Sequence, residues 1–203
     1  MMDNERIHSL QIDLEKCTGC VICTMACPTK AIRVRNNRAE IFRESLCIDC
    51  GECMRVCPEN AIGSMTLKTR DLAGYKKLVA VPSPVLYSQF DDTITPNDVL
   101  LGLLDIGFDF VYDVALSNEK VLAAINHYLD QNEDIRPGIS NYCPAVVRLI
   151  VKNYPALIDH VIPIEMPREI AAQRVRAEVV QRTGVKPEEI GIFTISPCAA
   201  LMV

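Results

Sequence analysis

Eight of the ten cysteines in this 203-residue chain lie within its first 57 positions, in two runs of the same spacing. Each run has the form C-x2-C-x2-C-x3-C-P, and the second run starts thirty residues after the first. The segments that follow are also alike, since Pro28–Ile32 and Pro58–Ile62 share their proline, alanine and isoleucine. This is an internal repeat, and each copy predicts a cysteine loop, a short helix and then a strand. Asn36 and Asn37 between two apolar runs predict a hairpin.

The cysteine spacing suits iron–sulfur cubes better than zinc or disulfides. Two intervening residues let consecutive thiolates point at neighbouring irons of one cube. Zinc takes tetrahedral sets of four ligands, and disulfides are rare in reducing compartments. No run of about 18 apolar residues occurs, and the charged start does not resemble a secretory signal. We therefore expect a cytoplasmic protein with no membrane span, and the net charge of −5 argues against a nucleic-acid partner.

The repeat resembles bacterial two-cluster 4Fe-4S ferredoxins over about residues 8–65. In that arrangement the fourth cysteine of each run ligates the cube held by the other run. The resemblance implies two ligand sets, which are Cys17, Cys20, Cys23 and Cys57 for cluster 1 and Cys47, Cys50, Cys53 and Cys27 for cluster 2. Gly19 and Gly51 would allow close backbone approach. We expect two 4Fe-4S clusters that transfer electrons, with an electron donor or acceptor protein as partner.

Beyond about residue 70 the chain changes to apolar runs that alternate with helical patterns. The predicted strands are Lys77–Val81, Phe108–Val114, Gly138–Tyr142 and Gly191–Ile195, and the predicted helices include Val99–Asp105, Ala145–Asn153 and Pro167 to about Gln181. The expected fold is an α+β ferredoxin-like two-cluster domain over residues 1–70, followed by a partial α/β domain with a parallel sheet over residues 76–203. No Gly-rich phosphate loop occurs, so we expect no bound nucleotide.

Residues 76–203 resemble the start of the catalytic domain of iron-only (FeFe) hydrogenases. The resemblance rests on short motifs in the family's order, which are Val81–Val85, Ser140–Ala145, Tyr154-Pro155 and Ile195–Ala199. It implies that Cys143 and Cys198 are two of four thiolates holding the 4Fe-4S part of the H-cluster. That cube is joined to a two-iron unit with CO and cyanide ligands. Ser83, Pro84 and Ser196 would line its pocket. The alternative reading makes both cysteines small buried hydrophobes.

Tyr142 occupies the position where rapidly working family members carry a proton-relay cysteine. A phenol with an ordinary pKa of about 10 is a poorer proton shuttle at neutral pH than a thiol of about 8.5. Ser196 likewise replaces a methionine, Met166 a hydroxyl residue, and Leu201 lies near the place of a lysine. These differences indicate a hydrogen-sensing or slow, group D-like member of the family.

Only two of the four H-cluster thiolates occur in the chain, which we expect to be truncated at its carboxyl end. The H-cluster would then form only with the missing part, and this chain alone would be inactive. The leading hypothesis is the amino-terminal part of an FeFe-hydrogenase-like oxidoreductase from an anaerobe, with downstream signalling or output domains if it is a sensor. The alternative is a non-catalytic two-cluster electron carrier with a degenerate hydrogenase-like tail.

Overall fold

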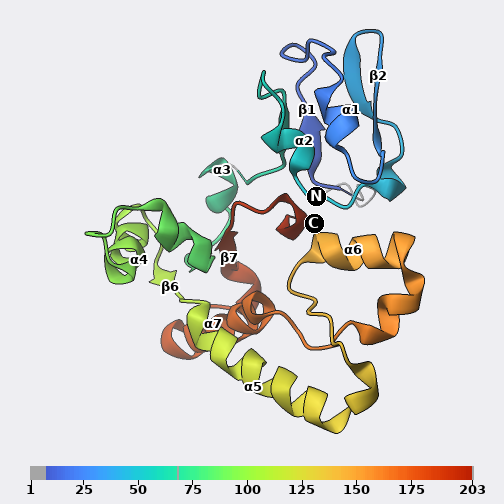
Figure 1. Cartoon of the computed structure of the whole chain (residues 1–203). Coiled ribbons are helices and arrows are strands. Elements are labelled where there is room, and N and C mark those ends of the chain that lie inside the picture. The colour runs from blue at the N-terminus through green and yellow to red at the C-terminus, as the bar shows by residue number, and fades with distance from the viewer. Residues whose placement is uncertain (1–7, 68, 203) are drawn as a thin grey trace. The chain divides into compact units, whose positions relative to one another are not determined.

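The computed structural model of the chain describes residues 8–67 and 69–202 (Figure 1). These residues form two compact units. The first, the cysteine-repeat unit, runs up to Thr66 and also takes Ser140–Val161 and the residues from Cys198 onward. The second, the sheet unit, takes Leu67–Ile139 and Ile162–Pro197. The sequence predicts a single division of the chain at residues 70–76. In the structure, two segments that come later in the chain pack with the cysteine repeats.

Short elements build the cysteine-repeat unit, and the two halves of the repeat have the same element order. The elements are β1 (Leu10–Ile12), α1 (Ile22–Ala26), β2 (Ile32–Arg35), β3 (Arg38–Ile41), α2 (Glu52–Arg55), β4 (Ile62–Ser64) and, from the later segment, α6 (Pro144–Asn153). Helix α1 is followed by strand β2, and helix α2 by strand β4. The predicted order of cysteine loop, helix and strand is therefore confirmed in both copies.

Two antiparallel strand pairs hold this unit together. Strand β1 pairs with β4, and β2 pairs with β3 in a hairpin. Asn36 and Asn37 form the hairpin turn with φ angles of 51° and 57°. Asparagine tolerates this left-handed conformation better than most residues, and two consecutive positive φ angles match the twist of the strands. The hairpin predicted at these two asparagines is confirmed.

A three-stranded parallel sheet organises the sheet unit, with strand order β6-β5-β7. The elements are α3 (Thr69–Leu72), β5 (Lys77–Pro82), α4 (Pro96–Asp105), β6 (Phe110–Val111), α5 (Ala115–Gln131), α7 (Pro167–Thr183) and β7 (Ile190–Ile195). The core joins Val79 and Val81 of the central strand to Val175 and Val179 of α7. A strand buried on both faces reads as a continuous apolar run, as Leu78–Val81 does. The predicted parallel α/β layer is confirmed.

One predicted strand is too long, and another does not form. Of Phe108–Val114 only Phe110–Val111 is extended, because the Phe108 N–H donates to the helix carbonyl of Leu103 (3.3 Å) and Val114 precedes α5. Gly138–Tyr142 is not a strand. Only Ile139 bridges a neighbour, and the chain turns at Ser140, whose hydroxyl accepts the Tyr142 N–H (3.2 Å).

Three helices begin within three residues of their predicted starts. A capping box of Thr95 and Asp98 opens α4 at Pro96, three residues before the predicted Val99. In it, each side chain bonds the other residue's backbone N–H. Proline opens both α6 and α7 at their first helical position. Within the described part of the chain, no helix combines the length and apolar character needed to cross a membrane.

Candidate iron–sulfur centres

Two cavities in the cysteine-repeat unit each gather four cysteines. The first is lined by Cys17, Cys20, Cys23 and Cys57, together with the apolar side chains of Val34, Ala39, Ala61 and Ile62. The second is lined by Cys27, Cys47, Cys50 and Cys53, together with Leu10, Ala31 and Ile32. In both, three cysteines come from one run and the fourth from the other. The two groupings coincide with the ligand sets expected from the sequence.

The donors in both cavities suit an iron–sulfur cube. Four thiols surround each space, which is the donor set that such cubes take. Among the described residues, no group of three metal-binding side chains converges closely enough to hold a single ion. A cube is bound at its corners and therefore needs thiols spread around a larger centre.

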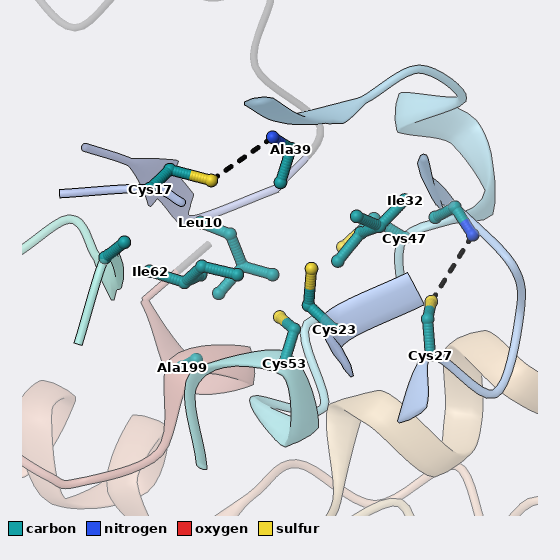
Figure 2. Close-up of a cluster of buried hydrophobic side chains, with 12 residues drawn as sticks. Leu10, Cys17, Cys23, Cys27, Ile32, Ala39, Cys47, Cys53, Ile62 and Ala199 are labelled. Carbon is teal, nitrogen blue, oxygen red and sulfur yellow. Dashed lines mark hydrogen bonds between the residues drawn. The ribbon is translucent and has the colours of Figure 1, made fainter. Parts of the chain in front are cut away.

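Backbone N–H groups already point at several of the sulfurs. The Ala31 N–H donates to Cys27 Sγ and the Ala61 N–H to Cys57 Sγ, both at 3.3 Å. These two bonds occupy equivalent places in the two repeats. Ala39 on β3 donates to Cys17 Sγ, also at 3.3 Å (Figure 2). Hydrogen bonds to a thiolate stabilise its negative charge, so the loops are arranged for charged sulfur.

Burial acts on several of the thiols in the opposite direction. It raises the pKa of Cys47 to about 11 and the pKa of Cys53 to about 12. Burial also raises the pKa of Cys27, but hydrogen bonds led by the Ala31 N–H outweigh it, so the pKa of Cys27 is lowered overall. Metal ligation requires the thiolate. Iron bound at Cys47 and Cys53 would therefore replace protons.

Left-handed backbone turns shape both loops. Gly19 and Asp49 occupy the same place in the two repeats, with φ angles of 71° and 54°. Val21 and Gly51 form a second such pair, with φ angles of 61° and 75°. Only Gly19 is also crowded, because a Cβ there would lie 2.6 Å from the carbonyl oxygen of Asn37. Glycine is therefore required at position 19 by space as well as by conformation.

We expect Gly19→Ala to be much more damaging than Gly51→Ala. Both variants would place a Cβ in left-handed backbone, which costs about 1–2 kcal/mol. At Gly51 the nearest atom is the Ala199 Cβ at 4.0 Å, an ordinary contact. At Gly19 the β2–β3 hairpin would also have to move. Thermal unfolding and iron content after anaerobic reconstitution check this, and equal losses in the two variants would contradict it.

The structure separates the remaining sequence-predicted site residues between the two units. Tyr142, Cys143 and Cys198 belong to the cysteine-repeat unit. Cys143 is exposed at the N-cap of α6, so the reading of this residue as a buried hydrophobe is wrong, and Cys198 is half-buried. Tyr142 is 48% exposed. All three therefore have surface in contact with solvent.

Ser83, Pro84 and Ser196 belong to the sheet unit, at the carboxyl ends of neighbouring strands. Strand β5 ends at Pro82, which lies opposite Ile195 at the end of β7. The Ser83 N–H donates to the Ile195 carbonyl at 2.8 Å, which draws the two strand ends together. Ligands of parallel sheets bind in crevices beyond such strand ends.

Sequence reasoning missed a buried polar group beside the second cavity. Asp49, which lines that cavity, has a fully buried side chain and forms an ion pair with Arg148 of α6. Ser9 donates to the same carboxylate. The available signal was the aspartate itself, which stands where the first repeat has Gly19.

Residues 76–201, more than half of the chain, match the family described as iron-only hydrogenase large subunit, C-terminal domain. The chain belongs to this hydrogenase family. Residues 16–62 match the 4Fe-4S dicluster domain. The description of this second match names the 4Fe-4S cluster as the cofactor type of the cysteine-repeat unit.

Some relatives of this hydrogenase-family chain match nearly its whole length, and others match only about a quarter of it. The periplasmic Fe hydrogenase large subunit of Nitratidesulfovibrio vulgaris is 26% identical over 218 residues, covering 98% of this chain and 51% of the relative. A ferredoxin of Methanothermococcus thermolithotrophicus is 36% identical over 56 residues, 27% of this chain and 93% of the relative. This chain thus spans about half the length of the hydrogenase relative.

The fold is shared with a solved hydrogenase. A variant of FeFe-hydrogenase HydA1 from Chlamydomonas reinhardtii superposes with a TM-score of 0.55 at 22% identity, over 66% of this chain and 37% of that one. At this identity the likeness concerns the fold.

Proposed function

We propose that this chain is the electron-relay part of an FeFe-hydrogenase-like protein, with two 4Fe-4S cubes held by its eight repeat cysteines. The observation that carries this proposal is the pair of cavities, each lined by three cysteines of one run and the fourth of the other. A bound cube supplies reversible one-electron storage. The chain holds it with four thiolates, donates backbone N–H bonds to its sulfur ligands and surrounds it with apolar side chains. Crossed ligation also keeps the two cubes near each other for electron exchange.

The hydrogenase-type centre is the second part of the proposal. Cys143 and Cys198 would be two of its four thiolates, and Ser83, Pro84 and Ser196 would border its pocket. Such a centre catalyses 2H⁺ + 2e⁻ ⇌ H₂ and needs two thiolates that this sequence lacks. Tyr142 in the relay position supports slow turnover or hydrogen sensing, because a phenol releases its proton less readily than a thiol. Downstream output domains would then read the state of the centre.

The natural partner is a one-electron donor or acceptor protein, and we place the protein in the cytoplasm on its sequence. The hydrogenase relative from Nitratidesulfovibrio vulgaris carries the name of a large subunit, which supports work within a redox assembly. The second candidate function is a two-cluster carrier whose hydrogenase-like part binds no metal. It is favoured by the presence of only two cysteines outside the repeats.

Iron content, infrared spectrum and hydrogen turnover separate these functions. All three are measured on the native protein, isolated without oxygen from its own cells. We expect more than about eight irons per chain, infrared bands of CO and cyanide ligands, and slow hydrogen turnover. Iron at about eight with no such bands would favour the second candidate. Iron far below about eight, with no cube signal on reduction, would contradict both. Fast turnover would contradict the role given to Tyr142.

A further inference from the structure

One position breaks the likeness between the two cysteine loops. In the first loop Gly19 leaves no room for a side chain, since a Cβ there would meet Asn37. In the second loop the equivalent residue is Asp49, which lies between the ligand candidates Cys47 and Cys50. Its side chain is 0% exposed. The second cavity therefore has a buried carboxylate in its wall. The first cavity is lined by the carboxylate of Glu59, but that residue is exposed and does not lie at the matching place.

The Asp49 carboxylate is fully engaged. Its Oδ1 accepts the Ser9 N–H at 2.8 Å and lies 3.1 Å from the Ser9 hydroxyl. Its Oδ2 accepts a hydrogen bond from the guanidinium of Arg148, whose side chain is 26% exposed. The same oxygen Oδ1 lies 4.0 Å from Cys47 Sγ. Burying a charge is costly without a partner, so Arg148 is what permits a carboxylate at this depth.

The segments that carry Cys143 and Cys198 both contact Asp49 or its hydrogen-bond partner Ser9. Arg148 lies on α6, which begins directly after Cys143. The Ser9 hydroxyl also lies 2.9 Å from the Ala199 carbonyl oxygen, one residue after Cys198. Ala199 itself packs into the core formed by the repeat cysteines (Figure 2). Asp49 and its hydrogen-bond partner Ser9 thus each contact one of the two segments that carry these cysteines.

We propose that Asp49 and Arg148 are positioning residues that set the reduction potential of the second cube apart from that of the first. This inference rests on the proposed two-cube function. Reduction adds one negative charge to a cube, so a nearby carboxylate opposes it and a nearby guanidinium favours it. Inside a protein such charges act more strongly than in water, and groups beyond the ligands are known to tune cluster potentials. No such pair faces the first cavity from Gly19.

The test compares charge-changing variants of the full chain, reconstituted anaerobically with iron and sulfide. Asp49→Asn keeps the size and an oxygen acceptor for Ser9, and asparagine also tolerates left-handed backbone. It removes the negative charge, so the potential of the second cube should rise. Arg148→Gln removes the positive charge, so that potential should fall. The double variant should lie between the two single variants yet differ from the parent value, because the pair together is proposed to set this cube apart. The first cube should stay unchanged in all three.

The readout is a dithionite titration followed by electron paramagnetic resonance, repeated in a Cys17→Ala background to assign the second cube. Arg55→Gln is the matched control. It removes the same charge from α2, which carries Cys53, but the Arg55 side chain is 72% exposed and solvent screens it, so no shift is expected.

The outcomes distinguish failure of this inference from failure of the proposed two-cube function. Opposite shifts confined to the second cube support the inference. Equal shifts of both cubes, or none in Asp49→Asn, overturn it, and Asp49→Asn decides the matter even if Arg148→Gln fails to fold. Iron well below about eight per chain in the parent protein overturns the two-cube function and this inference with it.

Discussion

The double variant Cys27→Ala/Cys53→Ala is expected to keep one intact cube, about four irons per chain, whereas Cys23→Ala/Cys27→Ala keeps none. Cys27 and Cys53 line the same cavity although they belong to different runs. Their joint loss removes two ligands from one cube and leaves all four of the other. Cys23 and Cys27 belong to one run but line different cavities, so their joint loss damages both cubes.

The two double variants are matched controls for each other, because each removes two buried thiols. Iron and sulfide analysis with the spectrum of the reduced cubes measures the result. If each run instead served its own cube, the outcomes would exchange places. Cys23→Ala/Cys27→Ala would then keep about four irons, and Cys27→Ala/Cys53→Ala would lose both cubes. That exchange would contradict the crossed arrangement.

Features that depend on near neighbours in the sequence could be predicted. The cysteine repeat, the turn at Asn36 and Asn37, and the start of α7 at Pro167 are each indicated by residues a few positions apart. The parallel sheet followed from apolar runs alternating with helical patterns. The strand predicted over Phe108–Val114 was too long, because a helix carbonyl binds the Phe108 N–H and Val114 directly precedes α5.

The polar group beside the second cavity could not be predicted, because nothing local indicates it. Asp49 and Arg148 are 99 positions apart, and Ser9 and Ala199 are 190 apart. From the sequence alone, an aspartate between two cysteines is expected to be an exposed turn residue. An arginine on an amphipathic helix is expected to lie on the helix face that contacts solvent. Only the packing of Ser140–Val161 with the repeats brings the half-buried Arg148 to the buried Asp49. The same packing explains why the compact units do not follow a single division of the chain.

Val79→Asp is expected to unfold the parallel sheet of the sheet unit. Val79 is 0% exposed, and it lies opposite Phe110 on one side and Ile192 on the other. A carboxylate there would have no charged partner within the apolar core shared with α7. An unpaired buried charge costs several kcal/mol, a large share of the roughly 5–15 kcal/mol that stabilises a typical domain. Hydrogen exchange should show lost protection in β5, β7 and α7.

Thr194→Asp is the matched control, because Thr194 lies exposed on β7 of the same sheet. It changes strand propensity by no more than about 1 kcal/mol and buries no charge. Retained protection in Val79→Asp, or equal loss in both variants, would contradict the central place of β5. Because Ser83 and Ser196 follow β5 and β7, loss of the sheet would also separate these two residues. The eight repeat cysteines belong to the other unit, so iron content should persist when the sheet is lost, which would make cube binding separable from the hydrogenase-like framework.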